Sequence, residues 1–492
     1  IFRDHVEGIG VFDVLEHLDD DKNVVANLLQ MVVPGGYIFV TVPAFQSLWN
    51  NRDVMEKHKR RYRRSQLEQL FRSQGADVLS CRYIFFSISQ TPDSSGYIPT
   101  EKEMFRSFFD QVELADKLGF GVGWVAQAHL STEVQKMNKK PVVPHYPGEV
   151  GLCTDFVQIA REMFLRTEKM EVGSAVMSIL ASGGPIAHAE RIGAFLTLHG
   201  MEESEKRRLH IGYSAGRFEF MARPYGIVPR NEIEEVAWPA LRGQIFAEAS
   251  EIFLRLLNGE VISSKDVRKT ILTRDNFYSD EDWRKVQEVA KQIYGIESRP
   301  QEIEIPRRYQ FEQIKTIPQD WRSELLNVVI GSHDKKLQIE ANKWRPVQVF
   351  NLSITPPHII EETHERFSKY YHQDGGPWKR SMMPRTIMVF INDEEGLTFE
   401  ERSIAAKEEA RNALSIYWNA LEGTIDPNKL EKATDNAVIG NVEQVAKQIL
   451  DRFDKDDRLM CWFDFFNHDN ERVKRNMNAF MNKVVPIINK VE

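Results

Sequence analysis

The chain has 492 residues, 42% of them hydrophobic and 28% charged, which is typical of a soluble globular protein of roughly two to four domains. A formal net charge of −8 gives no overall attraction to nucleic acid or anionic membranes, and no apolar run approaches the ~20 residues of a membrane span. The three cysteines, Cys81, Cys153 and Cys461, lie far apart, which argues against a disulfide scaffold or a zinc site. We therefore expect a cytoplasmic protein without a metal site.

Residues 1–81 predict one small α/β segment. The stretch "GIGVFDVLEHLDDD" predicts a strand and a loop, "KNVVANLLQMV" has the apolar spacing of a helix, and "PGGYIFVTVPAF" predicts a turn and a strand. A second helix is predicted over "RSQLEQLFRSQGA" and ends near Gly75. The basic run "KHKRRYRRS" contains one aromatic residue, Tyr62, so we interpret it as a solvated face rather than a nucleic-acid site.

This segment resembles the C-terminal half of a class I S-adenosylmethionine-dependent methyltransferase, which has a Rossmann-like fold. Three stretches carry the resemblance in the family's order: "FDVLEHLDDD", "PGGYIFVTVPAFQSLWN" and "HKRRYRRSQLEQLFRSQGADV". In that family a glycine-rich loop and an acidic residue hold most of the cofactor, and they would precede Ile1. We therefore expect this chain not to bind S-adenosylmethionine. The alternative is a methyltransferase, or a bifunctional fusion, that is truncated at its N-terminus.

From Arg82 onward, eight predicted strands alternate with predicted helices. The strands are "RYIFFSISQ", "FGVGWVA", "MEVGSAVMS", "RRLHIGYSAG", "ELLNVVIGS", "PVQVFNLS", "PRTIMVFIND" and "RLMCWFDFF". Such alternation predicts parallel β–α units, and eight units over residues 82–492 predict a TIM (β/α)8 barrel in the α/β class. The charged segment at about 259–323, after strand four, predicts a long insertion. "RYIFFSISQ" also fits the methyltransferase pattern, and we expect the barrel to take residues 84–90, because a barrel that lacks a strand exposes open edges.

In TIM barrels the functional side chains follow the C-terminal ends of the strands. His129 comes shortly after strand two, so it is a candidate catalytic residue; the alternative is a packing histidine. Strand three contains the small residues Ser174 and Ala175, which leave room for a flat ring or else permit close packing.

The ends of strands four and five predict contacts with a ligand. The segment after strand four combines glycines that let the backbone approach a ligand with a hydroxyl and a cation, or it is a simple tight loop. Its candidate residues are Gly212, Ser214, Gly216 and Arg217. Strand five leads into a helix start where backbone N–H groups, a hydroxyl and an ammonium predict a phosphate site. These residues are Gly331, Ser332 and Lys335, and the alternative is an ordinary helix cap by Ser332 or Asp334.

Residues 82–492 resemble the bacterial luciferase-like flavin-dependent monooxygenase family. The resemblance rests on "FFDQVELADKLGFGVGWVAQAHLST", "GGPIAHAERIGAFLTLHG", "RLHIGYSAGRFEFMARPYGI", "VVIGSHDKK", "AVIGNVEQVAKQIL" and "NMNAFMNKVVPII", in the family's order. It implies that reduced FMN, delivered by a separate flavin reductase, reacts with O2, and that the resulting C4a-peroxyflavin oxygenates a small organic substrate. We also expect a homodimer.

The sequence departs from this family at four positions. Members often have acid–His–His where this chain has Gln127, Ala128 and His129, so His129 fills the second histidine position. Ala215 stands where luciferases place an arginine, and Lys335 replaces a Ser or Thr. Two further alternatives follow: a non-catalytic luciferase-like partner subunit, and an oxidoreductase that uses a deazaflavin.

Overall fold

The computed structural model describes most of the chain, in two compact units. The described residues are 6–12, 14–42, 57–62, 67, 70–71, 82–93, 95–128, 148–216, 219–351, 355–422, 434, 437–466 and 469–491. One unit comprises Ile1–Ser80 with Asn489–Glu492, and the other comprises Cys81–Ile488. Within the described residues, no helix combines the length and the apolar character that a membrane crossing requires.

The smaller unit is built on two parallel strands with a helix between them. β1 (Val6–Phe12) pairs with β2 (Val32–Thr41), and α1 (Asp21–Met31) connects them after the short turn η1 (Leu15–His17). Asp20 caps α1 by accepting the backbone N–H of Asn23. Val11, Leu15 and Val25 are buried in the core of this unit.

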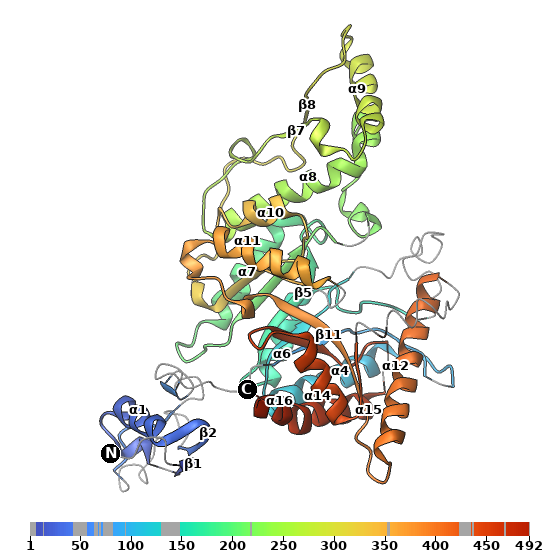
Figure 1. Cartoon of the computed structure of the whole chain (residues 1–492). Helices are drawn as coiled ribbons and strands as arrows, with labels where there is room; N and C mark the ends of the chain where they lie inside the picture. Colours follow the sequence, from blue (N-terminus) through green and yellow to red (C-terminus); the bar gives the residue numbers. More distant parts are fainter. Residues whose placement is uncertain are drawn as a thin grey trace. The chain divides into compact units, whose positions relative to one another are not determined.

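The larger unit contains one parallel sheet of nine strands among the residues described (Figure 1). Their order in the sheet is β10-β9-β6-β5-β4-β3-β13-β11-β12, and every pairing is parallel. The strands are β3 (Arg82–Phe86), β4 (Phe120–Val125), β5 (Glu171–Ser178), β6 (Leu209–Ser214), β9 (Leu326–Ile330), β10 (Gln348–Val349), β11 (Pro384–Ile391), β12 (Ala437–Gly440) and β13 (Arg458–Trp462).

The segment after β10 also bonds to β11. The N–H of Asn351 donates to the carbonyl of Pro384, and the N–H of Thr386 donates to the carbonyl of Asn351, each at 3.1 Å. These bonds form an isolated parallel bridge between Asn351 and Arg385. A strand that stands at one end of the sheet order is therefore linked to a strand near the other end.

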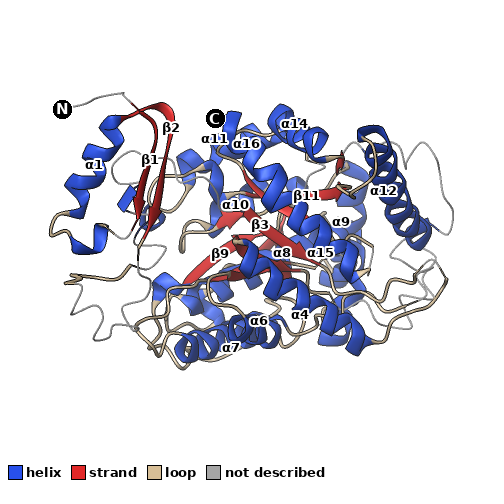
Figure 2. Cartoon of the chain, turned by 90° about the horizontal axis from the view of Figure 1, so that it is seen from below, coloured by secondary structure: helices blue, strands red, loops and turns tan. Residues whose placement is uncertain are grey.

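Helices lie outside the strands of the larger unit (Figure 2). They are α4 (Glu101–Leu118), α6 (Phe156–Arg166), α7 (Gly184–His199), α8 (Glu232–Leu257), α10 (Lys335–Ala341), α11 (Pro357–Tyr370), α12 (Phe399–Glu422), α14 (Val442–Arg452), α15 (Asn470–Ala479) and α16 (Val485–Val491). Apolar side chains are buried on both faces of the sheet: Phe86 packs in the cluster that includes the helices, and Phe85 and Trp124 pack in the cluster on the opposite face. Burial on both faces is typical of parallel sheets.

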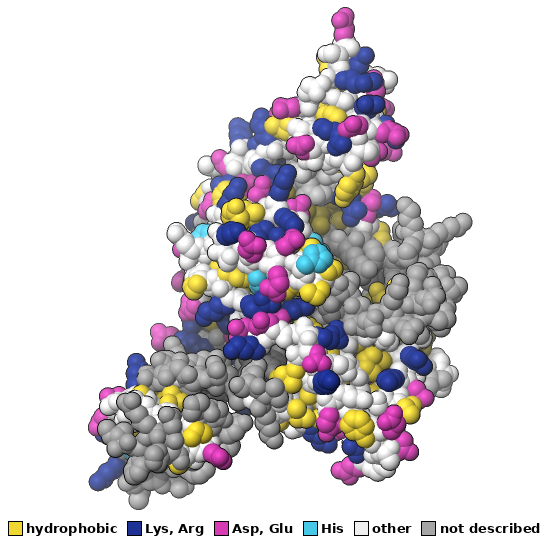
Figure 3. All heavy atoms as spheres, viewed as in Figure 1, with side chains coloured by type: hydrophobic (Ala, Val, Ile, Leu, Met, Phe, Trp, Pro, Cys, Tyr) yellow, Lys and Arg dark blue, Asp and Glu magenta, His cyan; other side chains and the backbone are white. Residues whose placement is uncertain are grey.

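The segment between α8 and β9 has its own secondary structure. It contains the antiparallel pair β7 (Thr270–Leu272) and β8 (Ile303–Ile305), with α9 (Asp280–Tyr294) between them. In Figure 1 this segment extends away from the sheet. Charged side chains of both signs alternate over its visible face (Figure 3).

Several elements differ from the sequence expectations. β3 ends at Phe86, whereas the sequence predicts a strand that continues to residue 90. β2 begins at Val32 and includes residues 34–36, for which the sequence predicts a turn. β12 was not predicted, since four residues give too short a pattern to recognise. β10 has two residues, whereas the apolar stretch "PVQVFNLS" predicts a longer strand. α8 begins at Glu232 and continues through Pro239, whereas the sequence predicts a helix only from Gly243; packing against the rest of the unit overrides the helix-breaking tendency of proline.

Candidate functional site

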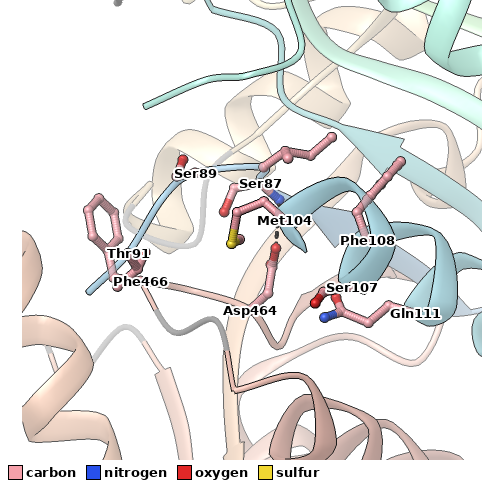
Figure 4. Close-up of a pocket in the computed structure, with 10 residues that line it drawn as sticks. Ser87, Ser89, Thr91, Met104, Ser107, Phe108, Gln111, Asp464 and Phe466 are labelled. Carbon is pink, nitrogen blue, oxygen red and sulfur yellow. Dashed lines mark hydrogen bonds between the residues drawn. The ribbon is translucent and has the colours of Figure 1, made fainter. Parts of the chain in front are cut away.

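Two neighbouring strands bring a carboxyl group and a serine together at the edge of the sheet. β3 pairs with β13 in the register Ile84 with Cys461, so both strands end at the same place. Ser87 directly follows β3, and Asp464 lies two residues after β13. The backbone N–H of Ser87 donates to Oδ2 of Asp464 at 2.9 Å (Figure 4).

A small pocket surrounds this carboxyl group. The exit segments of β3 and β13 form part of its wall, and α4 forms the rest. Figure 4 shows Asp464 among side chains from these three segments. The lining residues are Ser87, Ile88, Ser89, Thr91, Met104, Ser107, Phe108, Gln111, Asp464 and Phe466. None of these ten described residues is a lysine, arginine or histidine, so no lining residue supplies a positive charge to compensate Asp464.

The position of Asp464 changes its acidity. Burial raises the pKa of its carboxyl to about 7, although the N–H of Ser87 and the neighbouring Trp462 act to lower it. Its second oxygen, Oδ1, is buried and has no hydrogen-bond partner among the described residues. A carboxyl with a pKa near neutral exchanges a proton readily at physiological pH, which is the property that general acid–base catalysis requires.

Aromatic side chains from several strands pack beside this edge. Trp124 on β4 is fully buried, and its indole N–H has no acceptor among the residues described. The rings of Phe85 and Trp462 meet edge to face with centroids 4.5 Å apart. This group shields its surroundings from water, and the orphaned N–H of Trp124 can donate to a ligand acceptor.

A second polar network lies beside Trp124, whose ring centroid is 5.4 Å from that of His210. His210, near the start of β6, contacts Glu171 through Nε2 at 2.7 Å, and its Nδ1 faces the side-chain amide of Asn327 at 2.9 Å. The amide nitrogen is a donor, so Nδ1 accepts and Nε2 donates, which fits a neutral imidazole. Burial lowers the pKa of His210, which also favours the neutral imidazole. The hydrogen bonds of this network are therefore satisfied within the protein.

The structure brings several of the predicted ligand-binding residues together across three neighbouring strands. The register between β5 and β6 shifts between Ser174 and Met177, as in a β-bulge. The Ser174 hydroxyl donates to the carbonyl of Gly212 at 2.7 Å, and Ala175 packs against the aromatic cluster. A Cβ atom on Gly212 would collide with the Ser174 carbonyl, and one on Gly331 would lie 3.0 Å from the Val176 side chain. Close packing therefore accounts for Gly212, whereas a Cβ atom at Gly331 would require only a small shift of the Val176 side chain.

The turn after β6 is built by two of the predicted residues. The Ser214 hydroxyl accepts the N–H of Gly216 at 3.0 Å, and Gly216 has a φ of 84°, which favours glycine. The other two predicted residues of this region, Arg217 and the catalytic candidate His129, lie outside the described residues. Their roles stay predictions.

The predicted phosphate site already has partners within the protein. Asp334 caps α10 by accepting the N–H of Leu337, and the Ser332 hydroxyl accepts the N–H of Asp334. Lys335 is exposed, and its ammonium contacts Glu362 at 2.7 Å. Ser332 nevertheless retains its hydroxyl hydrogen, and an ammonium has two further hydrogens, so both side chains can still donate to an anion.

Asp464 and Ser87 were not predicted from the sequence. The available signal was an aspartate between Phe463 and Phe465, directly after the last predicted strand. An acidic residue within an apolar run is costly to bury, and it then often has a function. Ser87 gives no such signal, because its role depends on a residue 377 positions away.

Comparisons with known proteins identify the fold. No family model matches the sequence, and no curated protein matches it. The structure is similar to that of the monooxygenase RslO1 from Streptomyces bottropensis, with 15% sequence identity, 83% of this chain and 99% of that chain covered, and a TM-score of 0.55. It is also similar to the oxygenating constituent of 3,6-diketocamphane monooxygenase from Pseudomonas putida, a type II Baeyer–Villiger monooxygenase in complex with FMN, with 14% identity, coverages of 83% and 99%, and a TM-score of 0.50. The chain shares the fold of these proteins.

Proposed function

We propose that the larger unit is a flavin-dependent monooxygenase, which uses reduced FMN and O2 to oxygenate a small organic substrate. The fold carries this proposal, since the likeness extends over 99% of two monooxygenases, one of them in complex with FMN. We further propose that the sheet closes into an eight-stranded TIM barrel with β12 beside the ring. The link from Asn351 to β11 supports this closure. A separate flavin reductase would supply the reduced cofactor.

The residues at the C-terminal ends of the strands fit a flavin. A flavin ring carries both N–H and carbonyl groups, and the described residues offer an orphaned acceptor, Oδ1 of Asp464, and an orphaned donor, the indole N–H of Trp124. The bulge at Ser174 and Ala175 lies next to the aromatic cluster that would pack against such a ring. At the phosphate end, Ser332 and Lys335 retain donors.

Each of these groups has a chemical task in the proposed reaction. Bound reduced FMN supplies the electrons for oxygen activation. Asp464 holds or delivers a proton at its buried carboxyl, and the aromatic cluster excludes water from the reacting groups. Ser332 and Lys335 position the phosphate, and His129 is proposed to donate a hydrogen bond or a proton at the exit of β4.

Titration of the full chain with FMN and, in parallel, with a deazaflavin tests this proposal. Flavin fluorescence reports binding, and oxygen consumption with reduced FMN from an added reductase reports turnover. We expect saturable FMN binding with one site per chain. If the deazaflavin binds more tightly than FMN, hydride transfer becomes the proposed reaction in place of oxygenation. If neither cofactor binds, the proposal is refuted.

Replacing Lys335 tests the phosphate end of the site. Charge-assisted hydrogen bonds contribute about 1.5–3 kcal/mol, so Lys335→Ala should weaken FMN binding roughly tenfold or more. Removing the competing carboxylate by Glu362→Gln should instead strengthen it, because Glu362 holds the ammonium at 2.7 Å. Lys336→Ala, an exposed neighbour of the same charge, is the control. Equal FMN affinity in all three variants would show that Lys335 does not contact the phosphate.

A further inference from the structure

The smaller unit contains a cluster of three side chains that have the chemistry of metal ligands. Glu16, His17 and His58 each direct a ligand atom to one place, and these atoms all lie within 4.8 Å of one another. Glu16 and His17 are adjacent in the turn after β1. The rings of His17 and His58 meet edge to face, with centroids 4.7 Å apart. Two imidazoles and a carboxylate thus converge from segments about forty residues apart.

Backbone contacts hold these two segments in place. The N–H of Lys59 donates to the carbonyl of Glu16 at 2.7 Å, directly beside His58. The guanidinium of Arg60 donates to the carbonyls of Leu18 and Asp19 at 2.9 Å each. These backbone bonds hold together the two segments that carry Glu16 and His58.

The Glu16 side chain lacks a partner that would explain its burial. Glu16 is fully buried, and both of its carboxylate oxygens lack hydrogen-bond partners among the described residues. Two nearby cations are engaged elsewhere, since Arg60 pairs with Asp21 and Lys59 pairs with Asp19. A buried carboxylate without a counter-charge is unfavourable, so a cation is the missing component.

We propose that Glu16, His17 and His58 bind a divalent transition metal ion of the zinc class. Imidazole suits zinc and its neighbours in the transition series, and two histidines with one carboxylate leave a fourth position for water or an added ligand. In a tetrahedral site with bonds of about 2.0–2.2 Å the ligand atoms lie roughly 3.4 Å apart. The three ligand atoms lie within 4.8 Å of one another, so a bound ion would draw them closer together. The sequence predicts no metal site, but that expectation rests only on the spacing of the cysteines. The proposed metal site lies in the smaller unit and does not depend on the flavin proposal.

The test uses the full chain without a histidine tag, after removal of metal. Zn²⁺ binding is measured by calorimetry, and Co²⁺ is added in parallel because its visible absorbance reports a tetrahedral site. We expect one high-affinity ion per chain. Glu16→Gln and His17→Asn should each weaken binding at least about a hundredfold, since even outer partners of metal ligands contribute 10–100-fold. Asp19→Asn, an exposed acidic residue of the same unit, should bind like the wild type.

Thermal unfolding separates loss of the site from loss of the fold. Zn²⁺ should raise the unfolding temperature of the wild type and of Asp19→Asn but not of Glu16→Gln. The reason is that an ion stabilises the native state only of a protein that binds it. Without metal, Glu16→Gln should be at least as stable as the wild type, since it removes a buried charge. If a histidine cation neutralises Glu16 instead, the variant will be less stable without metal and the wild type will not respond to Zn²⁺. That result, or equal Zn²⁺ affinity in all variants, would overturn the proposal.

Discussion

Asp464→Asn should lower the rate of oxygen-dependent turnover by about a hundredfold or more while making the protein more stable above neutral pH. General acid–base groups typically contribute 10²–10⁴-fold to a rate, and asparagine has the shape of aspartate but no exchangeable acidic proton. The stability gain comes from removing a carboxylate whose Oδ1 is buried and lacks a partner among the described residues. A variant that loses activity and gains stability identifies a group retained for function.

The pH dependence of stability has a defined sign. Burial raises the folded pKa of Asp464 from 3.8 to about 7. Between these values the folded protein keeps a proton that the unfolded chain has released, so the free energy of unfolding falls as the pH rises. The contribution of protonated Asp464 to stability is therefore fully present below about pH 4 and is lost as the pH rises through 7. Asparagine does not titrate. The stability difference between Asp464→Asn and the wild type should therefore be small at pH 4 and reach its maximum above pH 7.

Unfolding temperatures and turnover rates measured across this pH range check the prediction. Asp374→Asn is a matched control, because the Asp374 side chain is 73% exposed. It should change neither quantity. The wild-type rate should also show a transition near pH 7 that is absent in Asp464→Asn. Turnover within twofold of the wild type would exclude a proton-transfer role, and a constant stability difference across the pH range would show that Asp464 titrates normally.

Arg385→Met should destabilise the larger unit by about 1–3 kcal/mol, the usual cost of removing the partner of a buried acceptor. Arg385, on β11, donates to Oδ2 of Asp457 at 2.6 Å, and the Asp457 side chain is 1% exposed. Arg380 binds the other oxygen of Asp457 at 2.9 Å. Methionine fills a similar volume but leaves Oδ2 without that partner in a buried place.

Urea unfolding of the larger unit, followed by tryptophan fluorescence, measures this loss. Lys369→Met is the control, since it removes the same charge from a pair with Glu365 in which both side chains are more than 60% exposed. Exposed pairs contribute about 0–1 kcal/mol, so the control should unfold at nearly the same urea concentration as the wild type. A similar, small shift for both variants would show that the buried pair contributes no more than a surface pair.

Much of the fold follows from the sequence, because the relevant signals are local. Runs of apolar residues predicted the strands, and the apolar spacing of "EKEMFRSFFDQVELADKLG" predicted α4, whose capping by Thr100 and Glu103 and end at Gly119 depend on neighbouring residues only. The small α/β pattern before residue 82 is likewise a local signal, and β1, α1 and β2 follow it. The alternation of strands and helices then favours a parallel sheet, which the larger unit contains.

The tertiary structure alone decided which side chains meet. Ser87 and Asp464 are joined only because β3 pairs with β13, and Glu16 and His58 only because Lys59 bonds back to the turn after β1. It also decided that Asp334 caps α10 and that Lys335 contacts Glu362, two contacts that compete with a phosphate at that helix start. Apolar spacing records how each segment folds on its own. The pairing of distant segments depends on packing and loop closure over hundreds of residues, which leave no periodic trace in the sequence.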